Sequence, residues 1–166
     1  MKQPENTQEL IALYYRLEIA ALVSPHSLRK RIGEGDTGFI LIDLRSNEEF
    51  RQGRIRGARS IPAYRDPDTP AVDEKRIVQA FKDLPTQKEV IIYCYSKPCM
   101  TGRKVGDLLA RSDIFVKHLG IGWNEWRHEW ASWNHEHELP HVSVLDYIET
   151  EQDKASAPPL GFLCEC

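Results

Sequence analysis

Short apolar runs alternate along the chain with segments whose apolar positions recur every three or four residues. The runs at 39–43, 90–93 and 114–118 have the length and β-branched composition of buried strands. Helical spacing is found at 73–84, between the first two runs, and at 105–109, after the second. Strands that alternate with helices predict an α/β fold: a central parallel sheet with helices on both faces.

The N-terminal segment carries a helical pattern of its own. Asn6 has the position of a helix N-cap, with Glu9 three residues later, a variant of the capping box. The apolar positions that follow at helical spacing are Leu10, Leu13, Tyr14, Leu17 and Ala21. Such stripes usually belong to the core, so we expect this helix to pack on the domain. The alternative is that it contacts a second copy of the chain in a homodimer.

The pattern divides the chain into three parts. Residues 1–23 form the N-terminal helical extension, residues 24–133 the α/β domain, and residues 134–166, where the periodicity fades, a C-terminal extension with a Cys-x-Cys tail. Within the domain, four tryptophans recur at intervals of three or four, which predicts one packed face of a helix. These are Trp123, Trp126, Trp130 and Trp133.

Composition narrows the classes of partner. The net charge of -3 at pH 7 gives no basic footprint for nucleic acid. No apolar run approaches the ~20 residues that span a bilayer, and the first residues lack the apolar segment of a signal peptide. We therefore expect no nucleic acid and no membrane partner, a cytoplasmic location, and cysteines that are reduced rather than paired in structural disulfides.

The candidate chemistry lies between the run at 90–93 and the helix that follows it. This loop contains Cys94 and Cys99. A loop that leads into a helix directs backbone N–H groups and the positive end of the helix dipole at what it encloses. We therefore expect a lowered pKa for Cys94, which would favour the nucleophilic thiolate. Ligands of parallel sheets bind at the carboxyl ends of strands, where Cys94 lies.

Three sequence segments together resemble rhodanese-like domains. Residues 39–58, FILIDLRSNEEFRQGRIRGA, are similar to the first family signature: a strand, an Asp-x-Arg, a Glu-Phe pair and a Gly-x-Ile-x-Gly-Ala turn. Tyr93-Cys94 matches the catalytic strand end, and residues 119–126, LGIGWNEW, are similar to the closing Gly-Gly-x-x-x-Trp turn. The matches run in family order from about residue 24 to 130.

The resemblance implies a sheet of about five parallel strands and, in active members, sulfurtransferase chemistry. A cysteine thiolate takes a sulfane sulfur from thiosulfate or a persulfide donor, holds it as a persulfide, and passes it to a thiol, a thiol protein or cyanide. It implies no cofactor. Three positions depart from the family pattern: Cys99 replaces an Arg or Thr, Arg54 a His, and Ile121 a Gly. The second thiol is similar to a subset with a Cys-aromatic-x-x-x-Cys loop.

These considerations give a set of candidate site residues. Cys94 is the candidate nucleophile and Cys99 a candidate resolving thiol, which would attack a persulfide or sulfenate on Cys94. The candidate substrate-binding residues are Arg103, Lys97, Tyr95 and Ser96, the two basic ones through contact with an anionic donor. Arg45 and Glu49 are expected to hold the fold through polar contacts.

Other readings of the sequence stay open. The loop could be a Cys94/Cys99 redox switch, or the domain a non-catalytic binding module. Cys164 and Cys166 could be an exposed tail, or a sulfur acceptor or redox partner that reaches Cys94 in the same or a neighbouring subunit. A metal site is the less favoured interpretation of the cluster His128, His135, His137 and His141, because a solvated polar segment explains it, and we expect no metal.

Overall fold

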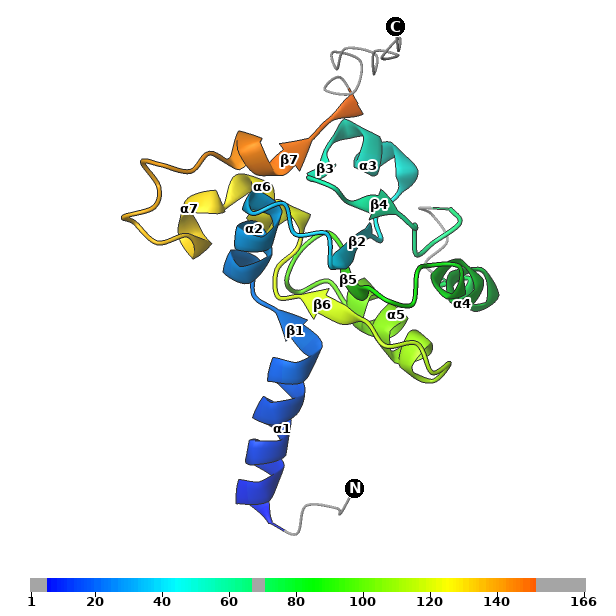
Figure 1. The fold of residues 1–166 in the computed structure, drawn as a ribbon. Coiled ribbons are helices and arrows are strands. Elements are labelled where there is room, and N and C mark those ends of the chain that lie inside the picture. The colour runs from blue at the N-terminus through cyan, green and yellow to red at the C-terminus, as the bar shows by residue number, and fades with distance from the viewer. Residues whose placement is uncertain (1–5, 67–70, 152–166) are drawn as a thin grey trace, which may run out of the picture.

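The computed structural model describes residues 6–66 and 71–151. Its centre is a five-stranded sheet with the order β1-β6-β5-β2-β4, in which every pairing is parallel (Figure 1). The strands are β1 (Leu22–Val23), β2 (Phe39–Asp43), β4 (Arg59–Ser60), β5 (Glu89–Tyr93) and β6 (Lys117–Leu119). The predicted α/β fold with about five parallel strands is confirmed.

Helices cover both faces of this sheet. Successive strand residues point to opposite faces, and since both sets are apolar, each face packs against helices. Ile40 and Ile42 pack with α4 and α5 in one buried cluster, and Leu41 packs with α2 and α6 in the other. The helices are α2 (Pro25–Gly33), α3 (Asn47–Gln52), α4 (Glu74–Lys82), α5 (Thr101–Ala110), α6 (Trp123–His128) and α7 (Trp130–Trp133). Both clusters are apolar, so burial of these side chains stabilises the layered arrangement.

The two central strands end at the same edge of the sheet. Asp43 is the register partner of Tyr93, and the amide of Leu44 donates to the carbonyl of Tyr93 at 3.0 Å. Cys94 follows directly, so it lies at the carboxyl ends of neighbouring parallel strands, as the sequence predicted.

Two elements differ from the predicted pattern. The strand expected at 114–118 begins only at Lys117, and Phe115 is 81% exposed. The tryptophan segment forms two short helices with a break at Glu129 rather than one helix. Trp126 is nevertheless fully buried, and its ring contacts those of both α7 tryptophans, so the expected packing role is confirmed.

The N-terminal helix α1 (Thr7–Ala21) is capped by Asn6, whose side chain accepts from the amide of Glu9. The expectation that α1 packs on the domain is wrong: none of its residues is buried, and it projects from the sheet in Figure 1. Its exposed large apolar side chains are Leu10, Ile11, Tyr14, Tyr15, Leu17 and Ile19. These side chains are spread around the helix rather than along one stripe. Contact with the domain on one side of α1 would therefore leave some of them exposed. The homodimer contact stays a prediction.

Part of the C-terminal extension returns to the domain, which the sequence did not predict. A 3₁₀ turn, η1 (Val144–Tyr147), leads into β7 (Ile148–Glu149), which pairs antiparallel with β3 (Arg54–Ile55). The Arg54 side chain is buried and its Nη2 donates to Glu149 Oε2 at 3.1 Å. The departure from the family's His at position 54 thus provides an ion pair to the extension.

Cys164 and Cys166 lie outside the described residues. Among the helices at 6–66 and 71–151, none combines the length and apolar character needed to span a bilayer.

Candidate active site

The loop that begins at Cys94 is held by the N-terminal end of α6 and the turn before it. The amide of Trp123 donates to the carbonyl of Cys94 at 2.9 Å, and the amide of Asn124 to the carbonyl of Tyr95 at 2.8 Å. Cys94 itself is 1% exposed and contacts the buried cluster between the sheet, α4 and α5. Its backbone position is therefore determined by the sheet on one side and α6 on the other.

Close contact between the loop and this turn requires glycine at position 122. A Cβ atom at Gly122 would lie 2.2 Å from the amide nitrogen of Ser96. The Glu125 carboxylate completes the junction, because it accepts from the amides of Gly122 at 2.8 Å and Lys97 at 3.0 Å. Ile121, by contrast, packs partly buried against the core, so this departure from the family pattern alters packing only.

Arg103 holds the far side of the loop. Its Nη1 donates to the carbonyls of Lys97 at 3.1 Å and Cys99 at 3.2 Å, from an exposed position on the first turn of α5. The Lys97 side chain is also exposed. The structure thus places both candidate anion-binding residues at the loop, where Arg103 shapes the backbone. Their contact with a substrate stays a prediction.

Backbone amides do reach the Cys94 sulfur, but burial dominates its ionisation. The amides of Ser96 and Gly102 both hydrogen bond to the thiol and favour its charged form. Burial, reinforced by the neighbouring Cys99 thiol, outweighs them and raises the pKa of Cys94 to about 12. The expectation of a lowered Cys94 pKa is therefore wrong, because the sequence shows the loop but not how deeply the side chain is enclosed.

The thiol with the lowered pKa is Cys99 rather than Cys94. Burial acts to raise it, but hydrogen bonds from the Thr101 hydroxyl and amide and from the Cys94 thiol together hold the pKa of Cys99 below its ordinary value. The structure thus brings the two thiols together as hydrogen-bond partners. Two adjacent negative charges repel, so loss of a proton from one thiol disfavours loss of a proton from the other. The first thiolate to form is that of Cys99, which is also the more exposed of the two.

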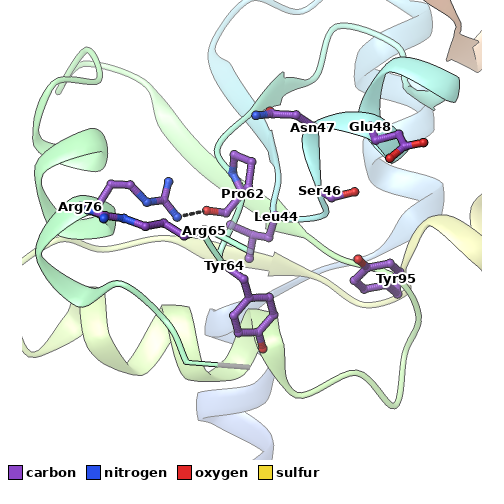
Figure 2. Close-up of a pocket in the computed structure, with 9 residues that line it drawn as sticks. All are labelled: Leu44, Ser46, Asn47, Glu48, Pro62, Tyr64, Arg65, Arg76 and Tyr95. Atoms are coloured by element: carbon purple, nitrogen blue, oxygen red, sulfur yellow. Dashed lines mark hydrogen bonds between the residues drawn. The ribbon is translucent and has the colours of Figure 1, made fainter. Parts of the chain in front are cut away.

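An open pocket of about 380 Å³ adjoins Tyr95, the residue after Cys94 (Figure 2), and neither Cys94 nor Cys99 is among its lining residues. In Figure 2, two arginines line one side of it and Tyr95 the other. Its lining residues are Leu44, Ser46, Asn47, Glu48, Pro62, Tyr64, Arg65, Arg76 and Tyr95. Of the predicted site residues, only Tyr95 lines the pocket. Its hydroxyl donates to Glu49 Oε2 at 2.6 Å, and burial, reinforced by this bond, raises the pKa of Tyr95.

Sequence reasoning missed Tyr64, Arg65 and Arg76. No motif or spacing in the sequence marks these three residues as part of a site. Tyr64 forms an isolated antiparallel bridge with Val72, which turns its side chain toward the site. No local pattern signals such a long-range pairing, so only the fold could reveal this pocket.

The family's Asp-x-Arg lies beneath the site as a buried polar unit. Arg45 donates to the Asp43 carboxylate through Nε and Nη2, and to the Gly53 carbonyl through Nη2. Tyr93 also donates to Asp43, at 2.6 Å. These contacts confirm that Arg45 holds the fold, and Glu49 does so through Ser46 and Tyr95.

A separate cluster tests the metal interpretation. His26, His135 and Glu138 place their ligand atoms within 4.8 Å of one another. However, Arg29 already lies among them, with its Nη2 2.5 Å from Glu138 Oε1 and 3.0 Å from His26 Nε2. A guanidinium at this point supplies the positive charge that a metal ion would bring, so these residues fit an ion pair between α2 and the C-terminal extension better than a metal site.

Comparisons with known proteins agree with this architecture. The chain is similar in fold to the BH2092 protein from Bacillus halodurans, with 26% identity, a TM-score of 0.59, and coverage of 75% of this chain and 82% of that one. A full-length protein from Lactobacillus plantarum has 13% identity and a TM-score of 0.59 over 75% and 95% of the two chains. The rhodanese-like domain of the Alr3790 protein from Anabaena has 16% identity and a TM-score of 0.50 over 88% and 92%.

No curated protein matches the chain in sequence. The family model described as the Rhodanese-like domain, however, matches residues 24–129, which is more than half of the chain. Together with the five-stranded parallel sheet and the cysteine at the end of β5, this match establishes that the chain belongs to the rhodanese-like domain family.

Proposed function

We propose that this protein is a sulfurtransferase that carries a sulfane sulfur as a persulfide on Cys94. The donor is thiosulfate or a persulfide, and the acceptor is a thiol or cyanide. The observation that carries the proposal is the position of Cys94 at the carboxyl end of β5 and ahead of α5, where the backbone amides of Ser96 and Gly102 act to lower its pKa. Such donors stabilise negative charge on a thiolate or a terminal persulfide sulfur.

The high pKa of Cys94 requires a base, and in this proposal the base is Cys99, a role that its lowered pKa supports. As Cys94 attacks the outer sulfur of thiosulfate, its proton passes to the Cys99 thiolate. The new S–S bond forms while the bond to the sulfonate sulfur breaks and sulfite leaves. An acceptor thiolate then attacks the terminal sulfur, which leaves Cys94 as a thiolate that recovers the proton. This is nucleophilic catalysis with an adjacent base, in which a thiolate takes the place of histidine.

Intact mass after treatment with thiosulfate tests the proposal. We expect the gain of one sulfur atom, and release of thiocyanate when cyanide is added. Cys94→Ser should abolish both, whereas the matched variant Cys99→Ser should still load sulfur, but more slowly. If Cys94→Ser retains loading, the proposal is wrong.

A second candidate function is a thiol redox switch, which the hydrogen bond between the two thiols favours. Peroxide would oxidise one thiol to a sulfenate, and the other would displace water to give a disulfide. Mild peroxide should then remove two hydrogen atoms from the mass and link the two cysteine peptides. Two thiols that remain alkylatable after oxidation would reject it. A chain that neither loads sulfur nor forms this disulfide would leave the non-catalytic binding module.

A further inference from the structure

The first turn of α5 contacts three different parts of the fold through three successive residues. The Thr101 hydroxyl lies 2.9 Å from the hydroxyl of Tyr64, which follows β4, and Arg103 donates to two carbonyls of the loop that contains both thiols. Gly102, between them, packs against the side chain of His118 on β6. This last contact joins the first turn of α5 to the central sheet.

The contact between Gly102 and His118 leaves no room for a side chain at position 102. A Cβ atom built on Gly102 would lie 2.7 Å from Cδ2 and 3.1 Å from Cε1 of the His118 ring, and closer still to Nε2. A Cβ atom on Gly106, about one turn further along the same helix, would meet nothing within 4 Å. The close approach is therefore specific to the N-terminal end of α5, which follows directly on the loop with the thiols.

His118 and Cys94 lie on the same face of the sheet. His118 is the register partner of Ile92 on β5, and Cys94 follows Ile92 by two residues, so the three side chains point to the same side. Ile92 and Cys94 belong to the buried cluster that α5 covers. The first turn of α5 thus packs on His118, while its Gly102 amide acts to lower the pKa of Cys94. The separation of helix and sheet at His118 therefore determines how near this amide comes to the sulfur.

The His118 ring is an uncharged group on a strand that is paired on both sides. Burial lowers its pKa to about 4, with a smaller contribution from the Arg103 charge, so the ring is neutral at neutral pH. Among residues 6–66 and 71–151, no hydrogen bond reaches it. Its register partners are Leu22 on β1 and Ile92 on β5. Any effect of the ring on Cys94 at neutral pH therefore comes from packing rather than from charge.

We propose that His118 is a positioning residue of the thiol site: Gly102 packs against its ring, and this contact sets how closely the first turn of α5 approaches the Cys94 sulfur. Backbone N–H groups at the start of a helix stabilise a thiolate or a terminal persulfide sulfur only where they come close to it. A misplacement of about 1 Å can cost roughly 10²-fold in rate. The inference rests on the proposed function, because it concerns the sulfur atom that carries the persulfide.

A cycle of substitutions at positions 102 and 118 of the full chain tests the pair. Gly102→Ala should slow the gain of sulfur from thiosulfate by roughly tenfold or more, because the new methyl group displaces α5 from the ring. His118→Ala should also slow it, because Gly102 loses the surface that holds it. The double variant should load faster than either single variant, since the methyl group of one replaces part of the ring removed by the other. The control Gly106→Ala, where an added methyl group meets nothing, should load sulfur as the parent does.

A second readout does not depend on sulfur transfer. In a chain with Cys99→Ala, the rate at which iodoacetamide alkylates Cys94 reports the ionisation of this thiol against pH, and mass spectrometry of the Cys94 peptide follows it. Gly102→Ala and His118→Ala should each move the profile to higher pH, and the double variant should move it back. Urea unfolding identifies any loss of stability, which would not shift the profile of the folded chain. Should Gly102→Ala fail to fold, His118→Ala alone decides through the same profile.

The outcomes separate the two proposals. Sulfur loading with parent-like profiles in the single variants, or a double variant as slow as the slower single variant, would retain the proposed function and reject His118 as a positioning residue. A wild-type chain that gains no sulfur would reject the proposed function, and shifted alkylation profiles that the double variant restores would still show that His118 positions the first turn of α5.

Discussion

The hydroxyl oxygens of Tyr64 and Thr101 lie 2.9 Å apart and connect the pocket wall to the thiol pair. Thr101 in turn hydrogen bonds to Cys99, and Cys99 to Cys94. A continuous chain of polar contacts therefore runs from a residue in the loop after β4 to the end of β5. Any change in one member alters the charge distribution at the next.

Thr101→Val should slow alkylation of Cys99. The substitution keeps the side-chain shape but removes the hydroxyl that stabilises the thiolate, so the pKa of Cys99 rises. A hydrogen bond to a charged group contributes about 1.5–3 kcal/mol, so we expect at least roughly tenfold slower alkylation at pH values below the wild-type pKa. The measurement is the alkylation rate against pH, with Ser112→Ala, which loses a hydroxyl bond to the Leu108 carbonyl, as control. An unchanged profile would contradict the assignment of the charge to Cys99.

The pH dependence of sulfur loading should change when Cys99 is removed. In the wild type, loading requires the Cys99 thiolate, so the rate rises with pH and levels off above the lowered pKa of Cys99. In Cys99→Ala, Cys94 must ionise by itself, and because burial, the largest cause of its raised pKa, remains after Cys99 is removed, the rate should continue to rise with pH. Near neutral pH we expect a loss of about 10²–10⁴-fold, the usual contribution of a general base. The measurement is the rate of mass gain with thiosulfate, and identical profiles would show that Cys99 is not the base.

His118 should make the fold less stable in mild acid. Burial, with a smaller effect of the Arg103 charge, lowers the pKa of His118 to about 4, whereas an unfolded histidine has its ordinary value near 6.5. Between these values the unfolded chain binds a proton that the folded chain does not. Stability is therefore complete above about pH 6.5 and falls as the pH drops toward 4, by up to about 3 kcal/mol.

The experiment for His118 is urea unfolding at a series of pH values. His118→Leu should flatten the dependence in this window, and His128→Gln, at an exposed histidine, should leave it as in the wild type. A slope that persists in His118→Leu would assign the effect to other groups.

Glu149→Gln should destabilise the chain by about 2 kcal/mol, because it leaves the buried Arg54 guanidinium without its counter-charge. The free energy of unfolding in urea measures this. Glu136→Gln removes a negative charge from an exposed position in the same extension and should have almost no effect. Equal losses in both variants would mean that the Arg54 ion pair contributes no specific stability.

The exposed apolar residues of α1 should mediate self-association. Leu10 and Ile19 are 56% and 77% exposed, and a helix with this surface gains by covering it. Sedimentation equilibrium should show a dimer that the double substitution Leu10→Glu and Ile19→Glu converts to a monomer, with unchanged sulfur loading. A wild-type chain that is monomeric at all concentrations would show this prediction to be wrong.

The central strands and their neighbouring helices were predictable because each has a strong local signal. Apolar runs identified β2 and β5, and at the start of α3 the local pair Ser46 and Glu49 forms a capping box with both reciprocal bonds. Asn6 likewise caps α1 as predicted. In all these cases, residues within a few positions of one another determine the structure.

What the sequence did not predict depends on distant partners. β7 is two residues long and exists because β3 lies beside it. The pocket arginines come together only when the loop after β4 folds toward the end of β5. The reversed order of ionisation at Cys94 and Cys99 follows from enclosure by the core, and enclosure is a property of the assembled fold rather than of the loop sequence.

The pairing of β3 with β7 means that the folded domain extends beyond the residues that match the family model. The match to the family ends at residue 129, yet a chain cut there would lose both the second strand of this small sheet and the carboxylate that neutralises Arg54. Residues 130–149 therefore stabilise the domain from outside the segment that matches the family. A minimal folded fragment of this protein must extend through Glu149.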